Sequence, residues 1–134
     1  MLKPLSSLAM KAHAWAWPNR ASDPKDEDII ERGYPYFKGV WSDKRSESWY
    51  LEVMAVRPDF QGKQVGKKLV TWGLNKAKED GVCASVISAW KKDDFYKKCG
   101  FDEQFGTAAK GPLEGVEGCN IYWKWPADAA QSNE

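Results

Sequence analysis

The sequence predicts an α/β fold, and three consecutive segments carry this prediction. Trp49–Val56 alternates in the manner of a half-buried strand. Val65–Asp80 repeats apolar residues at helical spacing, and Val82–Ser88 is the mostly apolar run expected of a buried parallel strand. A strand, a helix and a strand with a short return predict a right-handed crossover, and therefore a parallel strand pair.

The composition fits one compact domain of balanced charge. The 134 residues include 20 Lys and Arg against 19 Asp and Glu, for a net charge of +1, so we expect neither nucleic acid nor a membrane as a partner. The Ala-rich start is interrupted by Lys11 and His13, and we do not expect a signal peptide there. Three cysteines without metal-ligand spacing indicate free thiols in a reducing compartment. We therefore expect a cytoplasmic protein without a metal.

The first 48 residues are predicted to be mainly helical. Leu5–Trp17 could form a first helix, and Ser22–Pro24 has the capping side chain and the early proline of a second helix start. Gly33 is a plausible stop for that helix. The aromatic stretch that follows leaves room for at most one short strand, around Tyr36–Trp41.

The second half is predicted to continue with a short helix and two strands. Asp93–Lys98 begins with acids and ends with lysines, which matches the helix dipole. Phe101–Gly106 and Cys119–Trp125 are the predicted strands, and a Gly-rich linker joins them. We expect a single domain over residues 1–126 and a flexible tail over residues 127–134.

The segment between the strand and the helix of the crossover carries the strongest functional signal. Its sequence from residue 56 is Val-Arg-Pro-Asp-Phe-Gln-Gly-Lys-Gln-Val-Gly-Lys-Lys. A glycine-containing turn that leads into a helix is a natural phosphate site, because the first N–H groups have no intrahelical partner and the dipole places positive charge there. The pattern is neither a P-loop nor a dinucleotide fingerprint.

Two motifs resemble those of one known family. The run Gln-x-x-(Gly)-x-Gly over Gln61–Gly66 resembles the acetyl-CoA loop of the GCN5-related N-acetyltransferase (GNAT) family, and Tyr96 followed by Gly100-Phe101 resembles a second motif of that family. The similarity covers about Trp49–Trp125, and the chain is identified as a short member with an atypical N-terminal half. The resemblance implies a mixed, mostly antiparallel sheet with helices on both faces and a central parallel strand pair.

The two halves of the chain differ in how closely they follow this family. The resemblance makes residues 49–126 the acetyl-CoA-binding core and residues 1–48 a divergent helical part. The family normally places a strand, two helices and two more strands before Trp49, and here the first strands are either missing or disguised. A missing strand would leave an exposed edge that a second subunit could cover, giving a homodimer.

The resemblance implies acetyl-CoA as the co-substrate. Its pyrophosphate would be held by the amides and lysines of the loop, namely Gln61, Gly62, Lys63, Gln64, Val65, Gly66 and Lys67. Met54, Ala55 and Val56 would pair with the pantetheine arm where the strand separates from its neighbour. Gln64 departs from the family, which usually has glycine there because the backbone must approach the phosphates closely and can need a positive φ. A residue with a side chain costs about 1 kcal/mol or more in such a conformation.

Two residues are candidate catalytic groups. By the resemblance, Tyr96 would protonate the departing CoA thiolate; alternatively it is one more packed aromatic. Glu52, an acid inside the predicted strand, could take the proton of an attacking amine, or could simply face solvent or pair with a lysine. Tyr36, Phe37 and Trp90 could shape a hydrophobic acceptor pocket, and ordinary packing is the alternative for them.

The implied function is an acetyltransferase. It would move an acetyl group from acetyl-CoA to the amine of a small molecule, by direct attack in a ternary complex. No basic or acidic tract points to a peptide substrate. The alternative is a catalytically altered GNAT-like protein: a CoA- or metabolite-binding module, a partner subunit, or an enzyme that no longer uses CoA.

Overall fold

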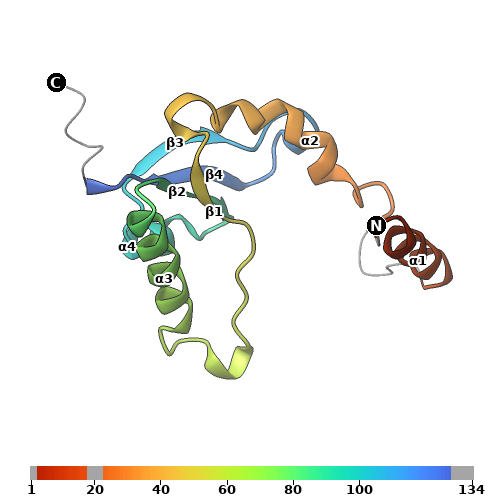
Figure 1. The fold of residues 1–134 in the computed structure, drawn as a ribbon, viewed down its shortest axis with the longest axis horizontal. Coiled ribbons are helices and arrows are strands. Elements are labelled where there is room, and N and C mark those ends of the chain that lie inside the picture. Colours follow the sequence, from red (N-terminus) through yellow and green to blue (C-terminus); the bar gives the residue numbers. More distant parts are fainter. Residues whose placement is uncertain (1–2, 18–22, 128–134) are drawn as a thin grey trace.

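The computed structural model describes residues 3–17 and 23–127 (Figure 1). Its helices are α1 (Lys3–Ala16), α2 (Ile29–Phe37), α3 (Val65–Glu79) and α4 (Asp93–Cys99), its strands are β1 (Ser48–Leu51), β2 (Cys83–Ala89), β3 (Glu103–Thr107) and β4 (Gly118–Lys124), and its 3₁₀ turns are η1 (Lys38–Val40), η2 (Asp43–Arg45), η3 (Pro58–Phe60) and η4 (Gly111–Leu113). The predicted tail lies outside the described residues, except for its first residue, Ala127.

The described strands form one mixed sheet in the order β1-β2-β4-β3. β1 and β2 are parallel, from the pair Ser48 and Cys83 to the pair Leu51 and Val86, and the other two pairings are antiparallel. Helices α3 and α4 lie on one side of the sheet and α2 lies on the other (Figure 1). The predicted mixed α/β class is confirmed, but the parallel pair lies at the β1 end of the sheet and not at its centre as predicted.

Alternating side chains of the central strands fill the two faces of the sheet. Ala84 and Val86 of β2 face α3, where they pack with Val70 and Ala77. On the other face, Ile87 packs towards α2 and η4. The central strands are therefore buried on both faces, which explains why β2 is a mostly apolar run.

Helix α3 forms where its apolar period predicts it. It ends at Glu79, and Gly81 follows with a φ of +70°, the left-handed conformation that favours glycine. Gly81 N–H donates to Lys78 O at 3.1 Å and Val82 N–H donates to Ala77 O at 3.0 Å. This pair of bonds satisfies the last carbonyls of the helix and turns the chain directly into β2.

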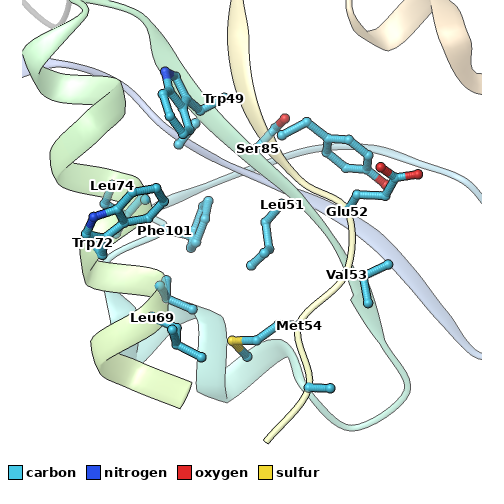
Figure 2. Close-up of a pocket in the computed structure, with 15 residues that line it drawn as sticks. Trp49, Leu51, Glu52, Val53, Met54, Leu69, Trp72, Leu74, Ser85 and Phe101 are labelled. Atoms are coloured by element: carbon cyan, nitrogen blue, oxygen red, sulfur yellow. The ribbon is translucent and has the colours of Figure 1, made fainter. Parts of the chain in front are cut away.

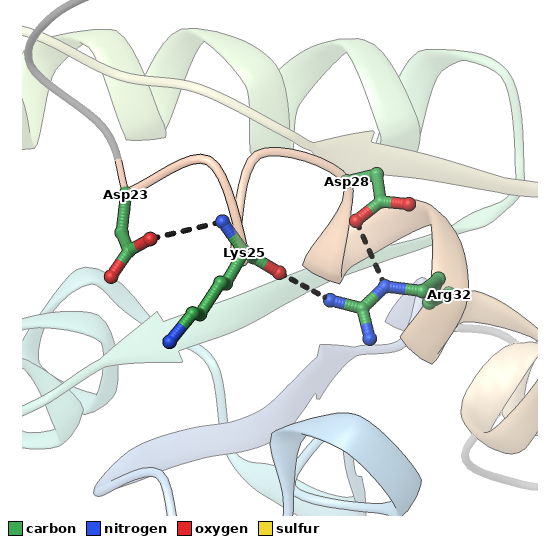
Figure 3. Close-up of polar contacts among 4 residues, drawn as sticks. All are labelled: Asp23, Lys25, Asp28 and Arg32. Carbon is green, nitrogen blue, oxygen red and sulfur yellow. Dashed lines mark hydrogen bonds and ion pairs between the residues drawn. The ribbon is translucent and has the colours of Figure 1, made fainter.

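The predicted start of α2 is several residues too early. Residues 24–28 are turns, and regular helix begins at Ile29. Asp23 Oδ1 accepts the N–H of Lys25 at 3.0 Å, and Arg32 ties the turns to the helix by donating to Lys25 O at 2.8 Å and to Asp28 Oδ1 at 2.8 Å (Figure 3). The Asp and the Pro thus cap a turn rather than a helix.

Gly33 does not end α2, and that prediction is wrong. The helix continues through Gly33 and Pro35 to Phe37. A Cβ at Gly33 would lie 2.9 Å from Leu113 Cδ1, so a larger residue there would force Leu113 of η4 to shift. Glycine at position 33 does have a structural cause, but the cause is a tertiary contact with Leu113 and not the end of a helix.

The short strand predicted around Tyr36–Trp41 is also absent: this segment is the end of α2 followed by η1. Trp41 Nε1 donates to Ser85 Oγ at 3.0 Å, which fixes the segment across the face of β2 instead of beside the sheet edge. The ion pair between Arg45 and Glu103, at 2.9 Å, holds the next turn to β3.

Helix α1 agrees with the predicted first helix and lies apart from the sheet (Figure 1). Its described side chains are exposed, including Leu8 and Trp15. In the described part of the chain, no helix combines the length and the apolar character needed to cross a membrane.

Candidate active site

Strands β1 and β2 separate at the carboxyl end of β1. Their last paired residues are Leu51 and Val86, whereas β2 runs on to Ala89 beside β4. Residues 53–56 have no strand partner within the part of the chain that the structure describes. Their backbone is therefore unpaired by any strand at the point where the resemblance requires a gap, although Val56 O accepts a side-chain hydrogen bond from Gln61.

The loop after this segment turns the chain sharply into α3. It contains η3 and a four-residue turn in which Gly62 has a φ of +74°. Gln61 Nε2 donates to Val56 O at 2.9 Å and ties the loop to the unpaired segment. Gln64, directly before the helix, has φ +61° and ψ +14°, which is left-handed. The positive φ expected at the family's glycine position is thus present, and a glutamine adopts it.

The first turn of α3 offers unused N–H donors. The first intrahelical bond runs from Lys68 N–H to Gln64 O at 3.0 Å. The N–H groups of Val65, Gly66 and Lys67 consequently have no partner within the helix, at the positive end of a 15-residue helix dipole. This is the environment that binds phosphate oxygens.

Tyr96 is positioned by the end of α4. Gly100 has a φ of +115°, Gly100 N–H donates to Lys97 O at 3.1 Å, and Phe101 N–H donates to Tyr96 O at 3.2 Å. The ring of Phe101 packs edge-on against the ring of Tyr96, with centroids 5.9 Å apart. The Tyr–Gly–Phe motif is thus a helix C-terminal motif that fixes the tyrosine.

The Tyr96 hydroxyl is held in its neutral form. The residue is half-buried between Phe95 and Phe101. Burial raises the pKa of Tyr96 above its ordinary value, and Cys99 adds to this shift. A neutral phenol can donate a proton, as a general acid must.

One groove of about 760 Å³ brings these parts together. It is lined by Met54 and Val56 of the unpaired segment, by the loop and first turn of α3 (Phe60, Gln61, Gly62, Gln64, Val65, Gly66 and Lys67), and by Ala89, Lys92, Phe95, Tyr96, Lys98 and Cys99. Three lysines and no acid are among these described lining residues, so the groove favours an anionic ligand.

Lys92 and Lys98 line the groove but could not be identified as groove residues from the sequence. Lys98 was expected only to complement the dipole of α4, and Lys92 belongs to no motif. Both lysines are close to Tyr96 in the sequence, at the start and near the end of α4. They lie beside the loop because α4 packs on α3, and the sequence does not show this packing. A Cβ at Gly66 would lie 3.5 Å from Phe95 Cζ, which shows how closely the two helices approach.

Comparison with known proteins agrees with this geometry. The family model described as "Acetyltransferase (GNAT) domain" matches residues 25–103, more than half of the 134 residues. The chain belongs to the GNAT family. The match includes the loop, the first turn of α3 and Tyr96. Searches of curated proteins and of solved structures found no match.

Several residues predicted for a GNAT site lie outside the groove. Lys63 does not line the groove itself, although its ammonium lies 5.4 Å from the ring centre of Phe60, which does. Ala55 lines a second groove, on the other side of the unpaired segment. Glu52 is exposed, lines that second groove and points away from α3 (Figure 2). Its charge contributes, after burial, to the raised pKa of Tyr50.

The residues predicted for an acceptor pocket are not gathered in one place. Phe37 is only 5% exposed and belongs to a hydrophobic cluster with Ala108 and Leu113. Tyr36 is exposed and packs against Gly111, where an added Cβ would lie 2.7 Å from its ring. Trp90 is exposed and carries the Lys91 ammonium 4.0 Å above its ring centre. None of the three lines the groove that contains Tyr96.

Proposed function

We propose that this chain transfers an acetyl group from acetyl-CoA to the amine of a small molecule, by direct attack in a ternary complex. The observation that carries the proposal is the single groove lined by an unpaired strand extension, by unused helix N–H donors and by a neutral tyrosine. Each of these three parts matches the chemistry of one section of acetyl-CoA.

The helix end suits the pyrophosphate. The free N–H groups of Val65, Gly66 and Lys67 can donate to phosphate oxygens, and Lys67 adds positive charge. Lys92 and Lys98 line the same groove and extend its positive field. The donor set therefore fits a ligand with several negative charges.

The unpaired segment suits the pantetheine arm. An amide-containing chain can pair with the unpaired backbone of residues 53–55 in the way that a strand pairs with a sheet edge. Met54 and Val56 supply the apolar wall beside it. This arrangement would direct the thioester towards the gap between β1 and β2.

The chemistry needs one proton donor and one proton acceptor. The thioester supplies an activated acyl group whose carbon–sulfur bond breaks as the amine nitrogen bonds to the carbonyl carbon. Tyr96 gives its phenolic proton to the leaving thiolate. The proton lost by the amine goes to water or to Glu52, which is exposed and beside the unpaired segment.

A second candidate function is a CoA-binding module without catalysis. Gln64 favours it, because this side chain stands where the family usually has none and where a ligand must approach the backbone. Such a module would keep the groove and would not depend on the Tyr96 hydroxyl.

The first experiment is calorimetric titration of the 134-residue protein with acetyl-CoA and with desulfo-CoA. Micromolar binding of both supports the cofactor site, and thiol release in the presence of candidate amines then tests transfer. An absence of binding at millimolar ligand would overturn both proposals for this chain.

Tyr96→Phe separates the two proposals. In a transferase it should lower kcat by about 10²- to 10⁴-fold, the usual contribution of a general acid, with little change in acetyl-CoA affinity. Tyr122→Phe is the matched control, since Tyr122 packs in the same cluster but does not line the groove. Equal turnover in the wild type and Tyr96→Phe would remove Tyr96 from the mechanism, and undetectable thiol release with every amine would favour the binding module.

A further inference from the structure

The outer edge of β1 is open. β1 and β3 are the terminal strands of the described sheet, and no described strand pairs with the outer edge of β1. An open edge presents unpaired N–H and C=O groups that can pair with a further strand. Proteins commonly protect such edges with charged residues or proline, but the sequence of β1 is Ser-Trp-Tyr-Leu.

An apolar groove of about 610 Å³ runs along this edge, between β1 and α3. Figure 2 shows Trp49 and Leu51 of β1 and Leu69, Trp72 and Leu74 of α3 around one hollow, with Phe101 between Trp72 and Leu51. Trp72 is 59% exposed, Leu69 is 48% exposed and Val53 is 81% exposed. Trp49 is held edge-on to Trp72, with centroids 6.0 Å apart.

This surface is large enough to be an interaction site. A buried aromatic side chain covers about 150–250 Å², so the exposed parts of Trp49, Trp72, Leu69 and Val53 amount to roughly 400 Å². The largest apolar patch on a monomer is about 300–600 Å² and is often functional. The unpaired backbone edge of β1 would add polar area to the same interface.

We propose that a second copy of this chain covers the β1 edge and the groove. Two β1 strands would pair antiparallel across a two-fold axis perpendicular to the sheet, giving a continuous eight-stranded sheet. Directly opposed residues of an antiparallel pair share a face. Trp49 would therefore meet the partner's Leu51 on the α3 face, and Leu69 and Trp72 would face the α3 helix of the partner subunit.

The open edge favours a strand over a helix or a small ligand, and a second β1 would bring a matching apolar face with it. The exposed apolar side chains of α1 could fill the groove, but a helix uses its own backbone hydrogen bonds and leaves the β1 edge unpaired. A small apolar ligand would leave it unpaired as well. A second β1 satisfies the edge and the groove together. This inference does not depend on the acetyltransferase proposal.

The test is sedimentation velocity of the full chain from low micromolar to millimolar concentration, for the wild type, Leu69→Lys and Ile30→Lys. Ile30 is the control because it is exposed on α2, on the other side of the sheet. A lysine at position 69 would face its own copy across the two-fold axis, and should weaken dimerisation by at least about tenfold, equivalent to 1.4 kcal/mol. Ile30→Lys should dimerise as the wild type does. Circular dichroism checks that each variant is folded.

Hydrogen exchange gives a second measurement that needs no variant. The outward amides of β1 should be protected in the dimer and should lose this protection on dilution. A chain that stays monomeric at every concentration would overturn the proposal. In that case the β1 edge would be covered by α1, by another polypeptide or by solvent. A dimer that Leu69→Lys leaves intact, with β1 amides that exchange freely, would also overturn it.

Discussion

Tyr96 illustrates how a sequence motif can be both structural and chemical. Gly100 is needed because its φ of +115° lies in a region that side-chain-bearing residues rarely adopt. Phe101 follows because its N–H and its ring both contact Tyr96. The spacing of the motif thus fixes Tyr96 at the wall of the groove, and the motif resemblance singled out this residue as a candidate before the structure placed it there.

The raised pKa of Tyr96 predicts the alkaline side of the pH profile. Burial disfavours the phenolate, so the general acid should stay protonated up to about pH 10, the ordinary pKa of tyrosine. We expect kcat for acetyl transfer to show no decline from this group below that pH, measured by thiol release under saturating substrates. A decline well below pH 9 in the wild type that disappears in Tyr96→Phe would contradict this assignment.

Gln64 predicts a gain of stability and of affinity on replacement by glycine. Its backbone is already left-handed without a ligand, so Gln64→Gly should stabilise the fold by about 1 kcal/mol by relieving strain. Removal of the Cβ should also let a pyrophosphate approach the backbone, which tightens acetyl-CoA binding several-fold. Thermal unfolding and calorimetry measure the two effects.

Lys91→Gly is the control for this substitution. Lys91 has a φ of +59° but does not line the groove. It should gain stability in the same way and leave acetyl-CoA affinity unchanged. An affinity gain in both variants, or in neither, would show that the side chain of Gln64 does not obstruct the ligand.

At the level of the elements, α2 depends on a contact rather than on its own sequence. Gly33 lies against Leu113, which is itself 6% exposed and packed with Phe37. Gly33→Ala should therefore overpack this cluster, while the higher helix propensity of alanine offsets part of the loss.

Gly39→Ala is the matched comparison, since nothing lies within 4 Å of a Cβ at Gly39. We expect Gly33→Ala to be less stable than Gly39→Ala by about 1–2 kcal/mol in urea unfolding. Equal stabilities would mean that Leu113 moves aside without cost and that glycine at position 33 has another cause.

The elements that sequence predicted well are those whose signal is local. Helix α3 has a regular apolar period and a glycine stop, and β2 is an uninterrupted apolar run, so both lie within one residue of their predicted bounds. The segment 24–41 was predicted poorly because tertiary contacts decide it: Leu113 against Gly33, and Ser85 with Trp41. Such contacts between distant residues leave no mark on local periodicity.

At the scale of the whole molecule, two grooves share one segment. Residues 53–56 separate the groove that contains Tyr96 from the groove beside the β1 edge, and Met54 lines both. The family resemblance predicted the first groove, because the loop over Gln61–Gly66 and Tyr96 both belong to sequence motifs of the family. The second could not be located from sequence, because it exists only where an edge strand and α3 leave apolar side chains without a neighbour.

This shared segment predicts a coupling between dimerisation and acetyl-CoA binding, if both proposals hold. Pairing of β1 with its partner would order residues 53–56 before the ligand arrives, so the dimer should bind acetyl-CoA more tightly than a monomer does. Because binding free energies are reciprocal, acetyl-CoA must strengthen dimerisation by the same factor, which we expect to be about fivefold or more. Sedimentation with and without acetyl-CoA gives one factor, and calorimetry on wild type and monomeric Leu69→Lys gives the other. A dimer whose association is unaffected by saturating acetyl-CoA would show that the segment is equally ordered in both states, and the two grooves would then act independently.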